Sequence, residues 1–477
     1  MENKITKNNQ INIFEAILPV VFLMLLLAYN IFKADGILLG DYSNQLILLI
    51  SGVFAMMIGI KNKTALKMMF QEVLMNFKSV LIPIVILLLV GALSGTWLVS
   101  GIIPAMVYYG LQILNPAIFL PASMLIASVI SLATGSSWTT SATVGIALIG
   151  IGTALGIPAG MIAGAVISGA YFGDKLSPLS DTTNLAPAMA GTDLYTHIKY
   201  MSFTTIPSYV ICLVIFSIMS FSIDTAGIAN LPDILDAIKT TFVITPLLFI
   251  VPVLVIVLIL LKTKPLLALS SGTVLAAAFA LYFQPDLINS LSDSKLKSIF
   301  NIIISETSIE TDNPALIKLY NAKGMIGMLW TILLILSAMV FGGIMDAIGA
   351  LSKITAVLLS FAKSIFGLFA STVLSCIGLN VIASDQYLAI VIPGKMFKNA
   401  FHDKGLAPEN LSRTLEDSGT VTSVLIPWNT CGAYQSEVLG VGVHEYFMYA
   451  IFNWLSPIMT LIYAGFNIKI RLLTAKK

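Results

Sequence analysis

Residues 169–187 read GAYFGDKLSPLSDTTNLAP, a polar interruption between two apolar stretches. Two prolines and two glycines predict a broken helix here, because proline cannot continue a helix and glycine weakens one. A broken helix frees backbone carbonyls that can ligate a cation. Asp174 and Asp181 add carboxylates, and the neutral oxygens come from Ser180, Thr182, Thr183 and Asn184. Hard cations favour an all-oxygen shell. The stretch therefore predicts a Na⁺ site, with a polar loop closed by side-chain turns as the alternative.

The composition of the whole chain sets the class of protein. Of 477 residues, 57% are hydrophobic and only 10% are charged, against about 25% charged in an average soluble domain. This composition excludes a soluble globular protein, a disordered chain and a nucleic-acid-binding protein. It predicts an all-α polytopic membrane protein. The three cysteines and three histidines show neither disulfide nor metal-ligand spacing, so we expect no cofactor.

Apolar segments of membrane-spanning length recur along the chain. A helix needs about 20 apolar residues to cross the hydrocarbon core, so we expect about 12 crossings. The continuous candidates are residues 11–33, 44–60, 78–100, 116–133, 138–157, 159–172, 200–222, 241–261, 265–283, 325–349 and 443–466. Two further stretches, 366–400 and 413–438, contain polar breaks and suit re-entrant hairpins or broken helices.

Basic residues in the short loops orient these crossings. Lysines gather around Lys61, Lys262, Lys353 and Lys395 and at the C-terminus, whereas the loop of residues 284–324 mixes acids with lysines. Cytoplasmic loops carry the excess of Lys and Arg. We therefore predict a multi-pass protein of the cytoplasmic membrane with both termini in the cytoplasm.

A second polar cluster, residues 134–145, lies inside a run that has no charge from Ser79 to Gly173. Lipid would leave its hydroxyls without partners, so we expect this segment to face protein or water. Hydroxyls that bond back to their own helix are the alternative, but the density of hydroxyls argues against that for all of them. The cluster supplies the predicted substrate-pathway residues Ser136, Ser137, Trp138, Thr139 and Thr140.

The C-terminal half repeats the arrangement loosely. Asp385 lies in one interruption, and a second interruption runs from Glu416 and Asp417 to Asn429 and Thr430. Each half thus has a hairpin-like break followed by a carboxylate, a Ser/Thr run, a proline and a glycine. We predict two repeats, residues 1–240 and 241–477. Paired interrupted segments in two halves are typical of a secondary transporter that binds its solute near the bilayer midplane.

Other classes of membrane protein lack their signatures in this sequence. The chain has no Walker A motif, no repeated selectivity-filter segment and no His-Glu-x-x-His motif. We therefore expect a secondary transporter and no enzyme, with a channel or an intramembrane enzyme as the alternative class.

Three stretches resemble the NhaC-type sodium/proton antiporters of the ion-transporter superfamily. They are GSSWTTSATVG (135–145), the segment 168–201 that contains GDKLSPLSDTTN, and LIPWNTCGAYQSEVLGV (425–441). The resemblance runs over nearly the whole chain. It implies a sodium-coupled antiporter built from two inverted repeats with hairpins. The family also contains members similar to malate/lactate antiporters and others linked to amino-acid uptake, and the shared motif does not separate these activities.

The residues and the resemblance together give a hypothesis for the mechanism. Asp174 or Asp181, with Asp385, Glu416 or Asp417, forms one site at which Na⁺ and H⁺ exclude one another. Asp174, Asp181, Thr182 and Asn184 are the predicted Na⁺ ligands, with further oxygens from the hydroxyl cluster and Asn429. The expected partners are the lipid bilayer, Na⁺, H⁺ and, in the alternative, a small organic acid or amino acid carried by an antiporter or symporter. The sequence leaves open a homodimer.

Overall fold

The computed structural model describes residues 11–33, 37–40, 42–113, 115–223, 231–261, 263–292, 294–313, 316–317 and 319–473. In the first half the helices are α1 (Ile13–Lys33), α2 (Ser43–Lys61), α3 (Leu66–Ser79), α4 (Leu81–Val99), α5 (Ile102–Ile113), α6 (Pro116–Thr134), α7 (Ser137–Thr140), α8 (Ile146–Ala154), α9 (Ala159–Leu176), α10 (Asp181–Ala190), α11 (Leu194–Phe221) and α12 (Leu231–Thr241). Lys262 and the segments 1–10 and 474–477, which enter the predicted orientation, lie outside the described residues.

The second half continues with helices and one small β-ribbon. Its helices are α13 (Ile250–Leu260), α14 (Pro265–Phe283), α15 (Pro285–Leu291), α16 (Lys295–Ile304), α17 (Gly324–Gly327), α18 (Leu329–Ala347), α19 (Ala350–Ser360), α20 (Ile365–Ile382), α21 (Gln386–Asp403), α22 (Pro408–Leu415), α23 (Thr430–Leu439), α24 (Val443–Tyr446) and α25 (Ile451–Gly465). Strands β1 (Thr307–Ser308) and β2 (Asn321–Ala322) pair antiparallel. The predicted all-α class is confirmed.

Helices that can cross a membrane dominate the described chain. Among the described residues, eight helices are long and apolar enough to span, and the bent pair of Leu231–Thr241 with Pro246–Leu260 makes up to nine. The predicted number of 12 is not confirmed by this count. Helix α11 shows how such a helix meets lipid, since Ile206, Val210, Val214 and Ile218 are all exposed along it. An apolar stripe of this kind on the surface fits a hydrocarbon environment.

The breaks predicted within residues 169–187, 366–400 and 413–438 are present, with two differences. Helix α9 ends at Leu176 and α10 begins at Asp181, so the break falls at 177–180. Gly169 and Gly173 do not interrupt α9; a Cβ at Gly173 would lie 2.4 Å from the carbonyl oxygen of Ser128, so these glycines let α9 approach α6. Residues 365–382 form a full-length helix, and the C-terminal interruptions begin only at Ala383.

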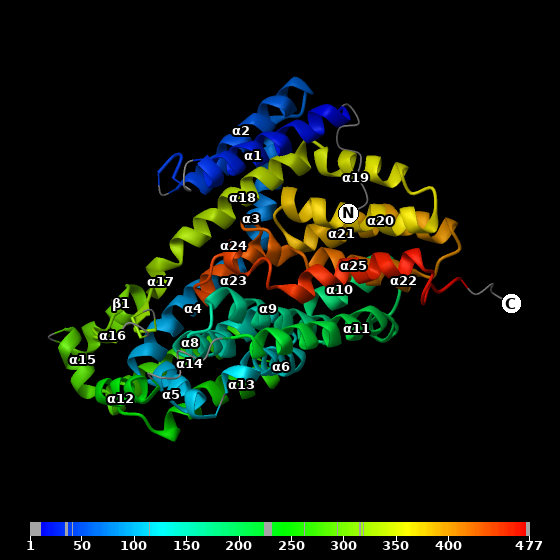
Figure 1. The fold of residues 1–477 in the computed structure, drawn as a ribbon. Helices are drawn as coiled ribbons and strands as arrows, with labels where there is room; N and C mark the ends of the chain where they lie inside the picture. Colours follow the sequence, from blue (N-terminus) through cyan, green and yellow to red (C-terminus); the bar gives the residue numbers. More distant parts are fainter. Residues whose placement is uncertain are drawn as a thin grey trace.

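Two π-helical turns mark the interrupted segments of the two halves, η1 (Ser141–Gly145) and η4 (Glu416–Thr420). Turns of this type are rare and occur often at functional sites. The two halves meet here, because α10 and α11 of the first half contact α21, α22 and α25 of the second. In Figure 1 the red and orange C-terminal helices lie directly beside the green helices α10 and α11.

Candidate functional site

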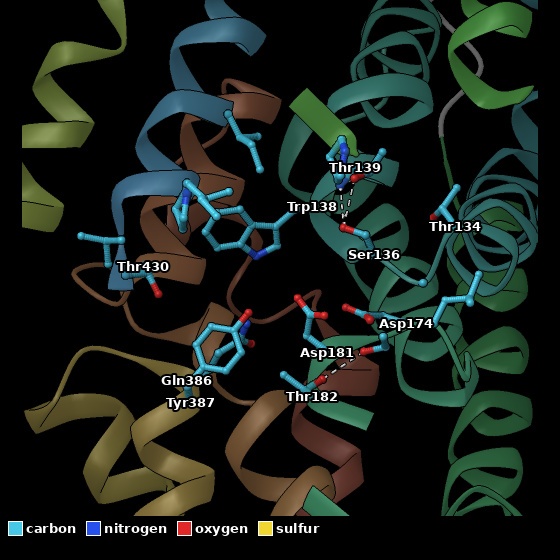
Figure 2. A pocket seen from close by; sticks show the side chains of 18 of the residues that line it. Thr134, Ser136, Trp138, Thr139, Asp174, Asp181, Thr182, Gln386, Tyr387 and Thr430 are labelled. Atoms are coloured by element: carbon cyan, nitrogen blue, oxygen red, sulfur yellow. Dashed lines mark hydrogen bonds between the residues drawn. The ribbon is translucent and has the colours of Figure 1, made fainter. Parts of the chain in front are cut away.

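A cavity of about 420 Å³, here called the carboxylate cavity, opens where these broken helices meet (Figure 2). Its lining residues are Ser79, Val80, Ile82, Pro83, Ile86, Thr134, Gly135, Ser136, Trp138, Thr139, Asp174, Leu179, Ser180, Asp181, Thr182, Ile259, Thr263, Pro265, Asp385, Gln386, Tyr387 and Thr430. The described lining includes the carboxylates of Asp174, Asp181 and Asp385 and no Lys, Arg or His. Its charge therefore favours a cation.

Asp174 is held in place by the start of α7. Ser137 donates its backbone N–H (3.1 Å) and its hydroxyl (2.7 Å) to Asp174 Oδ2. The preceding Gly135 ends α6 with φ +68°, and a Cβ there would lie 2.7 Å from the backbone carbon of Leu179. Only glycine fits this close left-handed turn. The turn thereby places the α7 N-terminus beside Asp174, which lines the cavity.

Asp181 begins helix α10 and is the most accessible of the three carboxylates. Its carboxylate lies beside that of Asp174 in Figure 2 and interacts with it electrostatically. Ser180 caps α10, and its hydroxyl lies 3.2 Å from that of Thr182. Two neighbouring like charges repel, so a bound cation or proton would stabilise this pair.

The second half contributes Asp385 and Thr430. Asp385 is 5% exposed and caps α21, accepting the Leu388 N–H at 3.0 Å. The preceding Ser384 has φ +58° and accepts a hydrogen bond from the Thr430 N–H at 3.0 Å, which ties the start of α23 to that of α21. Among the described residues no three His, Cys, Asp or Glu side chains converge as a metal-ligand group. A cation here would need hydroxyl and carbonyl oxygens as well as carboxylates.

Glu416 and Asp417 lie behind the cavity wall, fully buried in η4. The cavity-lining Thr182 donates to Glu416 Oε1 at 2.9 Å, while Oε2 has no hydrogen-bond partner among the described residues. Asp417 instead forms an ion pair with Lys175, whose side chain is completely buried. Thr204 and Thr460 also donate to Asp417. Glu416 is thus one hydroxyl away from the cavity, whereas Asp417 already has a counter-charge.

Sequence reasoning missed Lys175 as a site residue, because a lysine beside a polar stretch is typical of a cytoplasmic loop. The structure places its Nζ 2.9 Å from Ser456 Oγ and 5.6 Å from the ring centroid of Phe452. A signal was present, since Lys175 follows an uncharged run of membrane sequence. A lysine buried there needs an acid as its partner.

The other predicted residues divide into those near the cavity and those that hold the backbone. Trp138 lines the cavity and stacks on Tyr434, with ring centroids 4.0 Å apart. Thr140 bonds back to the carbonyl of Ser136 (2.9 Å), as the alternative reading expected. Thr183 donates to the Lys175 carbonyl (3.0 Å), and Asn184 to the Ser180 carbonyl (2.7 Å).

Asn429 is also fully buried but does not line the cavity. It caps α23 through the Cys431 N–H (3.0 Å) and donates to the carbonyl of Asn380 (3.1 Å). Asn429 therefore stabilises the start of α23, next to the cavity-lining Thr430.

Comparison with known proteins agrees with this arrangement. Residues 169–468 match the sequence profile of the Na⁺/H⁺ antiporter family. The chain belongs to this family. The Na⁺/H⁺ antiporter NhaC of Alkalihalophilus pseudofirmus is 39% identical over 386 residues, which cover 81% of this chain and 82% of that protein. Residues 169–468 include all three carboxylates of the described cavity lining, Asp174, Asp181 and Asp385.

Two other relatives of this chain are named for the transport of organic solutes. The malate-2H⁺/Na⁺-lactate antiporter of Bacillus subtilis is 35% identical over 448 residues, covering 93% of this chain and 92% of that protein. The arginine/ornithine antiporter ArcD of Halobacterium salinarum is 36% identical over 384 residues, covering 80% and 77%. The family to which this chain belongs is one of transporters.

Proposed function

We propose that this protein exchanges Na⁺ for H⁺ across the cytoplasmic membrane, and that both ions bind in the carboxylate cavity. One observation carries the proposal: Asp174, Asp181 and Asp385, from both halves of the chain, line a single cavity whose described lining has no cationic side chain. Acidic groups inside a membrane protein are costly unless they bind a cation or a proton.

The exchange follows from competition for the Asp174 and Asp181 pair. Either Na⁺ or H⁺ relieves the repulsion between the two carboxylates, so each ion displaces the other. The hydroxyls of Ser136, Thr139 and Thr182 lie on the same cavity and offer neutral oxygens for Na⁺. If the cavity changes sides only when one ion is bound, the two fluxes are coupled.

Glu416 is proposed as an inner proton acceptor, and Asp417 as part of the support. Thr182 bridges the cavity to Glu416 through one hydrogen bond, which provides a route for a proton. Lys175 neutralises Asp417 and leaves it without the free charge that a Na⁺ ligand needs. We therefore assign ion exchange to the three cavity carboxylates with Glu416.

The proposed entrance of the carboxylate cavity is cytoplasmic. Ser79 and Thr263, which line the cavity, stand beside Lys78 and Lys264 at the ends of α3 and α14. Lysines in the short segments that flank spanning helices such as α4 and α14 favour the cytoplasmic side. This side agrees with the orientation expected from the loops.

Purified protein in proteoliposomes tests the proposed function. Added Na⁺ alone should dissipate an imposed pH gradient, and Asp174→Asn or Asp181→Asn should abolish most of that response. Asp193→Asn is the matched control, because Asp193 is an exposed N-cap of α11 and asparagine also caps helices. Wild-type exchange in both cavity variants would exclude the Asp174 and Asp181 pair as the shared site.

Transport of a small organic solute is the second candidate. A volume of about 420 Å³ exceeds what one cation needs and lies in the range of small-molecule pockets. Three acids in a described lining that has no cationic side chain favour a cationic amino acid over an organic anion, unless Na⁺ binds first. A panel of cations, organic acids and amino acids in the same liposomes distinguishes the cases: a response only when a solute is present supports the second candidate.

A further inference from the structure

A second cavity of about 400 Å³ lies elsewhere in the bundle. It is called the Glu437 cavity here, and its charged lining consists of Glu306, Glu437, Glu445 and Lys323. Glu437 accepts hydrogen bonds from Lys323 (2.7 Å) and Thr331 (2.8 Å). Like the carboxylate cavity, it carries a net negative charge among its described lining residues.

Three segments place the two cavities at opposite ends of the same helices. Ile82 and Ile86 in the first half of α4 line the carboxylate cavity, whereas Ser94 and Leu98 nearer its end line the Glu437 cavity. In the α7–η1–α8 segment, Trp138 and Thr139 at the start line the carboxylate cavity, and residues between 146 and 153 at the end line the Glu437 cavity. Helix α23 begins at Thr430 in the first cavity and reaches Glu437 in the second. Helix α4 is long enough to span a membrane, and the two cavities lie toward its two ends. We therefore infer that they lie toward opposite sides of the membrane.

The protein between the cavities is thin. Glu437 follows Thr430 by seven positions, and at 1.5 Å per helical residue this is about 10 Å along α23. Residues 431–435 of α23 and most of η1 are buried there. The Trp138–Tyr434 stack closes the barrier on the side of the carboxylate cavity, and the Tyr434 hydroxyl donates to the carbonyl of Trp138 at 3.1 Å.

The other end of the barrier closes where η1 contacts α23. A Cβ at Gly145 would lie 2.9 Å from Leu439 Cδ2, so the missing side chain allows this contact. Within the described chain, both polar atoms of the buried Gln435 side chain and the hydroxyl of Ser141 have no hydrogen-bond partner. Native proteins rarely leave buried polar groups unpaired. Unpaired groups in the barrier are expected if they contact a hydrated ion in another conformation.

We propose that the Glu437 cavity is the opposite half of the ion path, and that separation of Trp138 from Tyr434 connects it with the carboxylate cavity. The proposal rests on the transport function proposed above, but it concerns access and not the identity of the ion. In the conformation described, the carboxylate cavity is open to one side and the Glu437 cavity to the other. Opening η1 away from α23 would give the carboxylates access to the second side.

Cysteine accessibility tests the two-sided geometry. Cys212, Cys376 and Cys431 are all buried and would be replaced by alanine. Thr263→Cys and Ser94→Cys then report on the carboxylate and the Glu437 cavities, because each residue lines one of them. A membrane-impermeant maleimide should label the first only from the cytoplasmic face and the second only from the opposite face. Labelling of both from one face would overturn the proposal.

Tyr434 variants test the barrier itself. Tyr434→Ala removes the stack and should raise the Na⁺-independent proton leak of proteoliposomes about tenfold, by favouring the open barrier. Tyr434→Phe keeps the ring and should stay as tight as wild type. A folded Tyr434→Ala protein without added leak would overturn the gating role.

If the alanine variant does not fold, Ala142→Cys provides the test. This fully buried barrier residue should react with the maleimide slowly in resting protein and faster during turnover. No change during turnover would overturn the proposal. If an organic solute and not Na⁺ drives turnover, the sidedness of labelling persists, so the two proposals fail separately.

Discussion

Loss of the buried lysine should destabilise the protein through the acid that it leaves behind. Lys175→Met keeps most of the side-chain volume but removes the charge that pairs with Asp417. Both groups are fully buried, so the variant would leave the Asp417 carboxyl without its counter-charge, with the hydroxyls of Thr204, Ser456 and Thr460 as its remaining donors. Removal of one partner of a buried ion pair costs about 3–5 kcal/mol. We expect a decrease of this size in the free energy of unfolding.

A double variant separates the unpaired charge from the loss of packing. Lys175→Met with Asp417→Asn removes both charges and should restore at least half of the lost stability, because replacing a whole buried pair is often nearly neutral. Lys78→Met, at an exposed lysine of α3, is the control and should change stability by less than about 0.5 kcal/mol. Denaturant titration in detergent micelles, followed by tryptophan fluorescence, measures the wild type, Lys175→Met, Asp417→Asn, the double variant and Lys78→Met. The reasoning is refuted if the double variant is as unstable as the sum of its single variants.

Three further predictions concern packing and the proton route. Gly173→Ala should cost about 1–3 kcal/mol, because its Cβ meets α6 backbone; Gly378→Ala, with open space around it, should be neutral in the same unfolding assay. Thr182→Val should slow exchange because Glu416 loses its donor, whereas Thr182→Ser should retain it; equal rates in liposomes would contradict the route. Asn380→Ala should destabilise by about 1–3 kcal/mol, since the Gly419 carbonyl loses a buried donor; unchanged thermal unfolding would count against this.

The sequence predicted the broken segments well, because their cause is local. Proline, glycine and dense hydroxyls disfavour a continuous lipid-facing helix wherever they occur. The structure accordingly breaks the chain after Leu176 and around Asp385 and Glu416. The assembly of Asp174, Asp181 and Asp385 around one cavity agrees with the expected meeting of the two halves, while their role in ion binding stays a prediction.

The sequence did not predict which of two neighbouring polar side chains faces the cavity and which faces the protein interior. Asp174 faces the cavity, whereas the next residue, Lys175, faces the interior, because successive helical residues point about 100° apart. Glu416 and Asp417 likewise have different partners, Thr182 and Lys175, although they are neighbours in one π-helical turn. No residue pattern in the sequence predicts that turn. The partner of Lys175 lies far away along the chain, so only the packing of the two halves reveals it.

Na⁺ binding as a function of pH is the most direct test of competition at shared carboxylates. Isothermal titration of the purified protein with NaCl, in buffers of different pH at constant ionic strength, gives the apparent Kd and the number of protons released. The account predicts that Na⁺ binding releases protons. In the acid range, the apparent Kd should increase about tenfold for each unit by which the pH is lowered, for each proton displaced. The Asp174→Asn and Asp181→Asn double variant should lose this dependence. An apparent Kd independent of pH, with no proton released, would contradict the central claim.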